Sequence, residues 1–133
     1  MAYEWVKKYI GIPFVSGGRT MDGCDCYGLA RLVLANEYGV ELPALSDDYA
    51  DALNVAETSR LFAENLPVLA GEKLTEPRER AVAVITEHGR PAHLGVVAGG
   101  GYILHTGIKT GSVCQRETHP GLRGRIEGYY HVG

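Results

Sequence analysis

The pattern of apolar and polar positions is most clearly helical between residues 25 and 38. Leu32 and Val33 lie three and four residues after Leu29, a spacing that puts all three on one face of an α-helix. Gly39 follows directly, and glycine commonly ends a helix. The pattern therefore predicts a helix over residues 25–38.

Two further segments of the first half favour helices. Residues 2–10 place Trp5 and Tyr9 four positions apart, on the same face of a short helix. Ser46 precedes acidic residues, as an N-cap does at the start of a helix. We therefore expect one helix over 2–10 and another over about 47–65.

The second half changes to short stretches rich in β-branched and aromatic residues, bounded by glycine or proline. The predicted strands are 81–86, 93–98, 102–106, 112–115 and 125–131. Helices followed by an antiparallel sheet form the α+β pattern. A length of 133 residues falls within the usual size of one domain, so we expect a single domain over 1–133.

Composition and charge narrow the function. The chain is 45% hydrophobic and 22% charged, with a formal net charge of -3, which is typical of an ordinary soluble globular protein. This charge gives no electrostatic support for nucleic acid binding. Residues 1–10 contain two lysines and no uninterrupted apolar run, so we expect neither a signal peptide nor a membrane span.

The segment 23–29 is the most informative part of the chain, because it places a cysteine on the first turn of the predicted helix. Asp25 is a good N-cap, which makes Cys26 the first helical residue. The unpaired N–H groups and the positive end of the helix dipole there favour a thiolate and could also receive an oxyanion. The alternative is that Cys26 is a small buried hydrophobe, as most free cysteines are.

The neighbouring Cys24 is expected to have a structural role. Cys24 lies before the N-cap, outside the predicted helix. The odd total of three cysteines fits poorly with a disulfide framework. A metal site made of Cys24, Cys26, Cys114 and a histidine is disfavoured, because Cys-x-Cys is not the usual zinc spacing. We expect no metal and no other cofactor.

A cysteine nucleophile needs an imidazole base, and that imidazole needs a partner for its other nitrogen. Two predicted strands form a hairpin around the three glycines 99–101. If the turn centres on Gly99, His93 faces His105 on the same side of the sheet. A two-residue turn on the first two glycines would instead pair His93 with Thr106 and send His105 to the opposite face, unless a bulge restored the alignment.

The remaining histidines are weaker candidates. His88 and His119 lie beside a glycine and a proline, as exposed loop residues do, and His131 is close to the C-terminus. His93 taken alone would be read as a polar residue at the start of a strand. The upstream cysteine is what makes it a candidate base.

Together these residues resemble the NlpC/P60 family of cell-wall cysteine peptidases. The matching segments, in chain order, are Gly11–Phe14 with Gly17 and Gly18, Asp25–Leu29, His93–Val97, and Leu104 with His105. The resemblance implies a papain-like α+β fold with N-terminal helices packed on an antiparallel β-sheet. It also implies that Cys26 is the nucleophile, His93 the general base and His105 the orienting third residue.

The resemblance further implies a substrate, an amide bond in the peptide stem of peptidoglycan, commonly the bond between D-glutamate and diaminopimelate. Asp25, Tyr27, Phe14 and Gly17 are then expected around the substrate or the oxyanion. Phe14 stands where many members carry a tyrosine whose hydroxyl lies near the oxyanion, so the backbone N–H of Cys26 must contribute more. Tyr27 is expected to narrow the cleft.

Tyr27 directly after the cysteine, and Leu42 with Pro43 after the helix, resemble the phage-tail branch of the family. This implies a protein of the virion tail that acts on the cell wall, with tail proteins as partners beside the stem peptide. One alternative is a structural tail-tip or assembly subunit with a weak or vestigial site, which Phe14 favours. Another is a thiol-dependent amidase or acyltransferase that uses the same Cys26 and His93.

Overall fold

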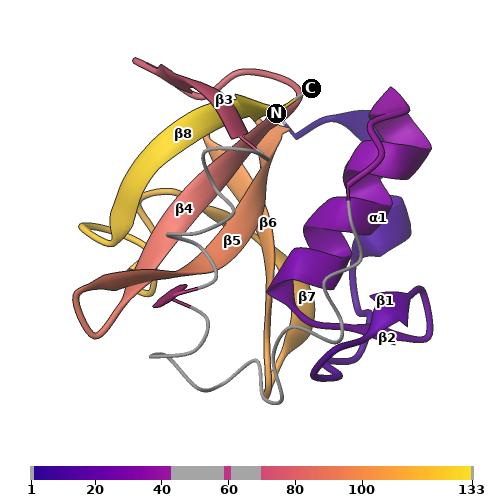
Figure 1. Ribbon diagram of the computed structural model, residues 1–133. Coiled ribbons are helices and arrows are strands. Elements are labelled where there is room, and N and C mark those ends of the chain that lie inside the picture. Colours follow the sequence, from indigo (N-terminus) through magenta and orange to yellow (C-terminus); the bar gives the residue numbers. More distant parts are fainter. Residues whose placement is uncertain (1, 43–58, 61–69, 133) are drawn as a thin grey trace.

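The computed structural model describes residues 2–42, 59–60 and 70–132. The elements in chain order are the 3-10 helix η1 (Glu4–Tyr9), β1 (Arg19–Thr20), β2 (Gly23–Cys24), α1 (Cys26–Tyr38), β3 (Ala70–Leu74), β4 (Ala81–Glu87), β5 (Arg90–Gly99), β6 (Tyr102–Gly107), β7 (Gly111–Arg116) and β8 (Ile126–Val132). Figure 1 shows α1 and the small β1-β2 hairpin beside one long twisted sheet.

The large sheet has six strands in the order β3-β8-β4-β5-β6-β7, and every neighbouring pair is antiparallel. The five predicted strands correspond to β4 through β8, with ends that differ by at most three residues. The short strands β1, β2 and β3 were not predicted. The α+β class, with N-terminal helices on an antiparallel sheet, is confirmed.

Helix α1 begins and ends where the sequence indicates. The Asp25 side chain accepts a hydrogen bond from the N–H of Gly28, which caps the first turn. At the other end Gly39 has a left-handed φ of 67° and donates its N–H to the carbonyl of Ala35. The Asp25 cap makes Cys26 the first helical residue, and the Gly39 cap ends the helix after Tyr38.

The segment predicted as a helix over 2–10 is instead the 3-10 helix η1. Trp5 and Tyr9 still pack edge to face, with ring centroids 5.9 Å apart. The Tyr9 hydroxyl donates a 2.6 Å hydrogen bond to Glu37, which attaches η1 to α1. The helix predicted over 47–65 lies outside the described residues except for 59 and 60, which are helical. Among the described residues no helix has the length and apolar character of a membrane span.

Apolar residues cover both faces of the sheet. On one face α1 packs against β5 and β6, and the core there includes Leu29, Val33, Val84, Val96 and Leu104. On the other face a second cluster is made of Ala81, Ala83, Ile85, Val97, Ile103 and Leu122. Leu122 comes from the connection between β7 and β8, which therefore closes this face.

The β5-β6 hairpin differs from both registers considered for it. Val96 pairs with Leu104 and Val97 with Ile103, and a bulge before Gly99 shifts the pairing of the remaining residues. This register is two residues away from the one that would put His93 opposite His105. Because a shift of two residues preserves the face, both histidines still lie on the same side of the sheet.

Candidate active site

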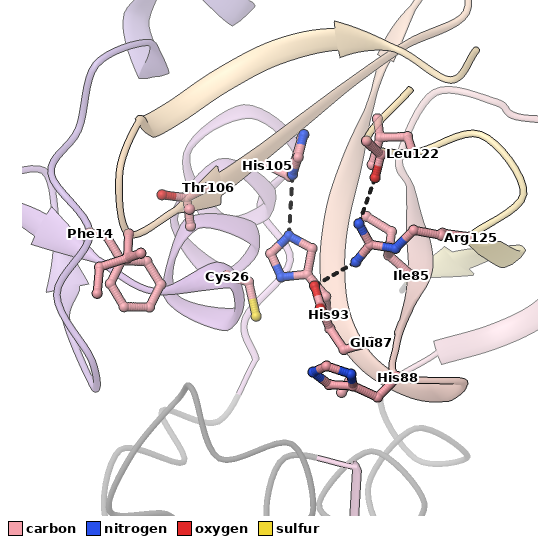
Figure 2. Close-up of a pocket in the computed structure, with 14 residues that line it drawn as sticks. Phe14, Cys26, Ile85, Glu87, His88, His93, His105, Thr106, Leu122 and Arg125 are labelled. Carbon is pink, nitrogen blue, oxygen red and sulfur yellow. Dashed lines mark hydrogen bonds and ion pairs between the residues drawn. The ribbon is translucent and has the colours of Figure 1, made fainter. Parts of the chain in front are cut away.

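Cys26 lies at a cavity of about 340 Å³ where the start of α1 meets the sheet. His93 and His105 line the same cavity, from β5 and β6. Figure 2 shows the sulfur of Cys26 pointing toward the ring of His93, with His105 on the side of that ring away from the sulfur. The structure therefore brings together the three residues that the sequence singled out as nucleophile, base and orienting group.

Asp25 holds the segment before the helix against its first turn. Its side chain is 1% exposed and accepts hydrogen bonds from the Gly28 N–H at 2.9 Å and the Gly17 N–H at 2.8 Å. It also forms a 2.8 Å ion pair with Arg19, whose side chain is 10% exposed. The buried carboxylate thus fixes the backbone on both sides of Cys26.

Close backbone packing adds to this support. A Cβ atom on Gly28 would lie 2.1 Å from the carbonyl oxygen of Gly18, far inside van der Waals contact. The loop that carries Gly18 can therefore rest directly on the helix only because residue 28 has no side chain. The position of the nucleophile depends on this contact.

The two histidines and a glutamine form a row of hydrogen bonds. Nε2 of His93 lies 3.2 Å from Nδ1 of His105, and Nε2 of His105 lies 2.8 Å from Oε1 of Gln115. With Nε2 engaged by His105, Nδ1 is the nitrogen of His93 that remains for Cys26. Figure 2 shows this second ring nitrogen on the side of the sulfur, the arrangement a general base requires.

Burial disfavours charge on the nucleophile and on its base. The pKa of Cys26 is raised to about 12, first by burial and then by the negative charge of Asp25, which together outweigh backbone hydrogen bonds from Leu94 and Tyr27. The pKa of His93 is lowered to about 3, mainly by burial and then by His105 and Arg125. The helix start alone predicted a thiolate, whereas its surroundings favour a resting pair of neutral thiol and neutral imidazole.

An oxyanion would meet the start of α1. Cys26 is the first helical residue, so its backbone N–H has no carbonyl partner within the helix. The Gly28 N–H, in contrast, donates to Asp25. The N–H of Cys26 can therefore donate to an oxyanion.

The residues expected around the substrate divide into two groups. Phe14 lines the cavity, and its ring lies on the opposite side of Cys26 from His93 (Figure 2). Asp25, Gly17 and Tyr27 lie outside the lining of the cavity. The Tyr27 ring is buried beneath the guanidinium of Arg19, which lies 5.2 Å from the ring centroid. A direct contact of these three residues with substrate stays a prediction.

Sequence reasoning missed a polar wall of the cavity, formed by Glu87, His88 and Arg125. Arg125 pairs with Glu87 at 2.6 Å and also donates to the carbonyls of Thr86 and Gly121. His88 is exposed, as expected for a loop residue, yet it lies at the cavity. The signal that could have found His88 is the β4-β5 hairpin. His88 lies in the turn of this hairpin, directly before the strand β5 that carries His93.

The remaining cysteines lie away from this site. Cys24 is fully buried in the core, and burial raises its pKa to about 11. Cys114 is half-buried on β7, and all three cysteines are free thiols. Within the described part of the chain, no three cysteine, histidine or acidic side chains cluster in a way that could hold a metal ion.

A cysteine at the start of a helix, packed on an antiparallel sheet that carries two histidines, defines a papain-like α+β protein. The model of the NlpC/P60 family matches residues 11–125. The chain belongs to the NlpC/P60 family. No protein with a curated description matches the chain.

Solved structures show the same fold. The NlpC/P60 domain of the peptidoglycan hydrolase SagA matches with a TM-score of 0.64 and 17% identity, over 96% of this chain and 92% of that one. The P60 domain of an antigen from M. avium subspecies paratuberculosis matches with a TM-score of 0.61 and 17% identity, over 96% and 89%. An NlpC/P60 family protein from Bacillus cereus gives 0.66 and 17%, over 96% of this chain but only 37% of its own.

Proposed function

We propose that this protein is a cysteine peptidase that hydrolyses an amide bond in the peptide stem of peptidoglycan, between D-glutamate and diaminopimelate. The observation that carries the proposal is the alignment of Cys26, His93 and His105 at one cavity. Family membership supports the substrate class, since the matching SagA domain belongs to a peptidoglycan hydrolase. The particular bond rests on the resemblance to the family alone.

The geometry supports acyl transfer through a thioester. Nδ1 of His93 takes the proton from the Cys26 thiol as the sulfur attacks the amide carbonyl carbon. The new imidazolium keeps its Nε2–H on His105, and the backbone N–H of Cys26 donates to the oxyanion. The imidazolium then protonates the leaving amine, and water attacks the thioester with His93 again acting as base, which releases the acid and restores the thiol.

The test compares two cysteine variants on purified peptidoglycan. Cys26→Ala is expected to abolish release of soluble fragments and to leave the thermal unfolding midpoint nearly unchanged. Cys114→Ala removes the same group from a half-buried position outside the cavity, and it should retain activity. Mass spectrometry of the fragments should show new D-glutamate carboxylates and new diaminopimelate amines. Full cleavage by Cys26→Ala would exclude Cys26 as the nucleophile.

We further propose that the protein acts in a phage tail, as the resemblance of Tyr27 and its surroundings to the tail branch suggests. Its partners would then be tail proteins as well as the stem peptide. A purely structural tail subunit is the competing function, and Phe14 in place of a tyrosine is the feature that favours it. Particles carrying Cys26→Ala that assemble normally but infect poorly would support the enzyme, and full infectivity would favour the structural subunit.

A further inference from the structure

Gln115 is the last member of the row of hydrogen bonds that begins at His93. It lies on β7, where Val113 pairs with His105, so Gln115 is two residues further along on the same face. It is half-buried and lies outside the lining of the cavity. Its Oε1 nevertheless lies 2.8 Å from Nε2 of His105.

In a neutral imidazole one ring nitrogen carries a proton and donates, while the other accepts. The role of one nitrogen in the row therefore fixes the role of the next. If Gln115 accepts through Oε1, Nε2 of His105 must hold the proton, and Nδ1 of His105 becomes an acceptor. Nε2 of His93 then donates to that acceptor, which leaves Nδ1 of His93 with a lone pair toward Cys26. The reverse order would put an N–H on Nδ1 of His93, and that nitrogen could not take the thiol proton.

We infer that Gln115 is a positioning residue that sets the tautomers of both histidines and so keeps Nδ1 of His93 basic toward Cys26. The inference rests on the proposed function, because it assigns Gln115 a part in the same chemistry. An amide oxygen suits this role, because it accepts a hydrogen bond from Nε2 of His105.

Two substitutions of Gln115 separate this role from simple packing. Gln115→Glu keeps an acceptor at the same length and, when ionised, has no hydrogen to donate to His105. Gln115→Met keeps the length and flexibility but removes the acceptor. Arg116→Met is the matched control, because it introduces the same side chain at an exposed neighbour on the opposite face of β7.

The direct measurement is ¹⁵N NMR of histidine-labelled protein near neutral pH, which reports which nitrogen of each ring carries the proton. Wild type, Gln115→Glu and Arg116→Met should show His93 protonated at Nε2. In Gln115→Met a second tautomer of His93 should appear. A wild-type His93 protonated at Nδ1, or an unchanged tautomer in Gln115→Met, would overturn the inference.

Reactivity gives the second readout. Alkylation of Cys26 by iodoacetamide at neutral pH should slow by about 10- to 100-fold in Gln115→Met, by analogy with residues that orient a metal-binding histidine through its other nitrogen. Gln115→Glu should stay near wild type. A Gln115→Met protein that alkylates at the wild-type rate would refute the role. Neither readout uses peptidoglycan, so a wrong substrate would leave both results intact and fail only the cleavage assay.

Discussion

Nε2 of His93 and Nδ1 of His105 lie 3.2 Å apart, with the two rings inclined at 78°. The contact holds the His93 ring by the nitrogen that does not face Cys26. A rotation of the ring that exchanged its nitrogens would break this hydrogen bond. His105 therefore acts on the nucleophile only through the orientation and the tautomer of His93.

Replacing His105 tests this dependence. His105→Ala should lower kcat by about 10²-fold with little change in KM, because His93 loses its orienting partner while the rest of the cavity remains. His105→Asn should recover part of the loss, since its amide oxygen can accept from Nε2 of His93. Kinetics on a stem peptide substrate would measure both variants. Equal activity of His105→Ala and wild type would show that the contact does not contribute to catalysis.

The neutral resting pair has a consequence for alkylation of Cys26 across pH. Burial raises the pKa of the thiol to about 12 and lowers that of His93 to about 3. Between these values the pair shares a single proton, so the fraction present as thiolate and imidazolium is constant. We expect the alkylation rate to be nearly flat from about pH 5 to about pH 8, as measured by mass spectrometry of the modified peptide.

His93→Gln supplies the control for the flat profile. Without the imidazole, Cys26 must lose its proton to solvent, and its alkylation rate should rise by about tenfold per pH unit over the same range. A wild-type profile that rises with pH and levels off near an ordinary thiol pKa would contradict the coupled pair.

The same buried histidine should weaken the fold in acid. In the unfolded chain His93 binds a proton near its ordinary pKa of 6.5, whereas in the folded protein it does so only near pH 3. The unfolded state therefore binds more protons between these values, and the free energy of unfolding falls as pH falls from 6.5 toward 3. The lowered pKa of His105 acts in the same direction.

Urea unfolding at pH 7 and pH 5 measures this loss. His93→Gln cannot bind this proton. Its free energy of unfolding should therefore fall less between pH 7 and pH 5 than that of wild type, and the difference should be on the order of 1 kcal/mol. If both proteins lose the same free energy, His93 titrates normally in the folded state.

The buried pair of Asp25 and Arg19 yields a prediction about stability. Asp25→Ala removes the cap of α1 and leaves the Arg19 charge without the carboxylate 2.8 Å away. We expect the free energy of unfolding to fall by roughly 3–5 kcal/mol, the usual result of breaking a buried pair. Chemical denaturation measures the change. Adding Arg19→Met to Asp25→Ala should restore part of the loss, and simple additivity of the two changes would argue against the pairing.

Local signals in the sequence predicted much of this fold. Asp25 and Gly39 marked the ends of α1, because capping depends on the residue type itself. The strands β4 through β8 were also predicted, because β-branched residues and glycine turns lie close together along the chain. The 3-10 form of η1 was not predicted. This segment is held by the hydrogen bond between Tyr9 and Glu37, which are far apart in the sequence.

The hairpin shows why register is harder to predict. All three glycines from 99 to 101 have positive φ values, and three glycines in a row can form more than one tight turn. The sequence therefore left open both which residues pair and whether His93 and His105 lie on one face. The positions of Gln115 and Arg125 at the site could not be predicted from local sequence patterns. They depend on how β7 pairs with β6 and on the loop before β8.

Gly28 provides the sharpest test of the support beneath Cys26. In most helices a change from glycine to alanine stabilises by roughly 0.5–1 kcal/mol. Here the new Cβ would lie 2.1 Å from the carbonyl oxygen of Gly18, so the loop or the helix start must move. We expect Gly28→Ala to be destabilising, the opposite of the helix preference, and to lower kcat because Cys26 shifts relative to His93.

The unfolding midpoint and the alkylation rate of Cys26 together measure both effects of Gly28→Ala. The matched control is Ala35→Gly, further along α1 where the side chain is only half-buried. It should lower the free energy of unfolding by about 1 kcal/mol and leave the alkylation rate of Cys26 unchanged. If Gly28→Ala proves as stable as wild type and equally reactive, the loop can yield without moving the nucleophile. The contact between residues 18 and 28 would then be close packing with no part in catalysis.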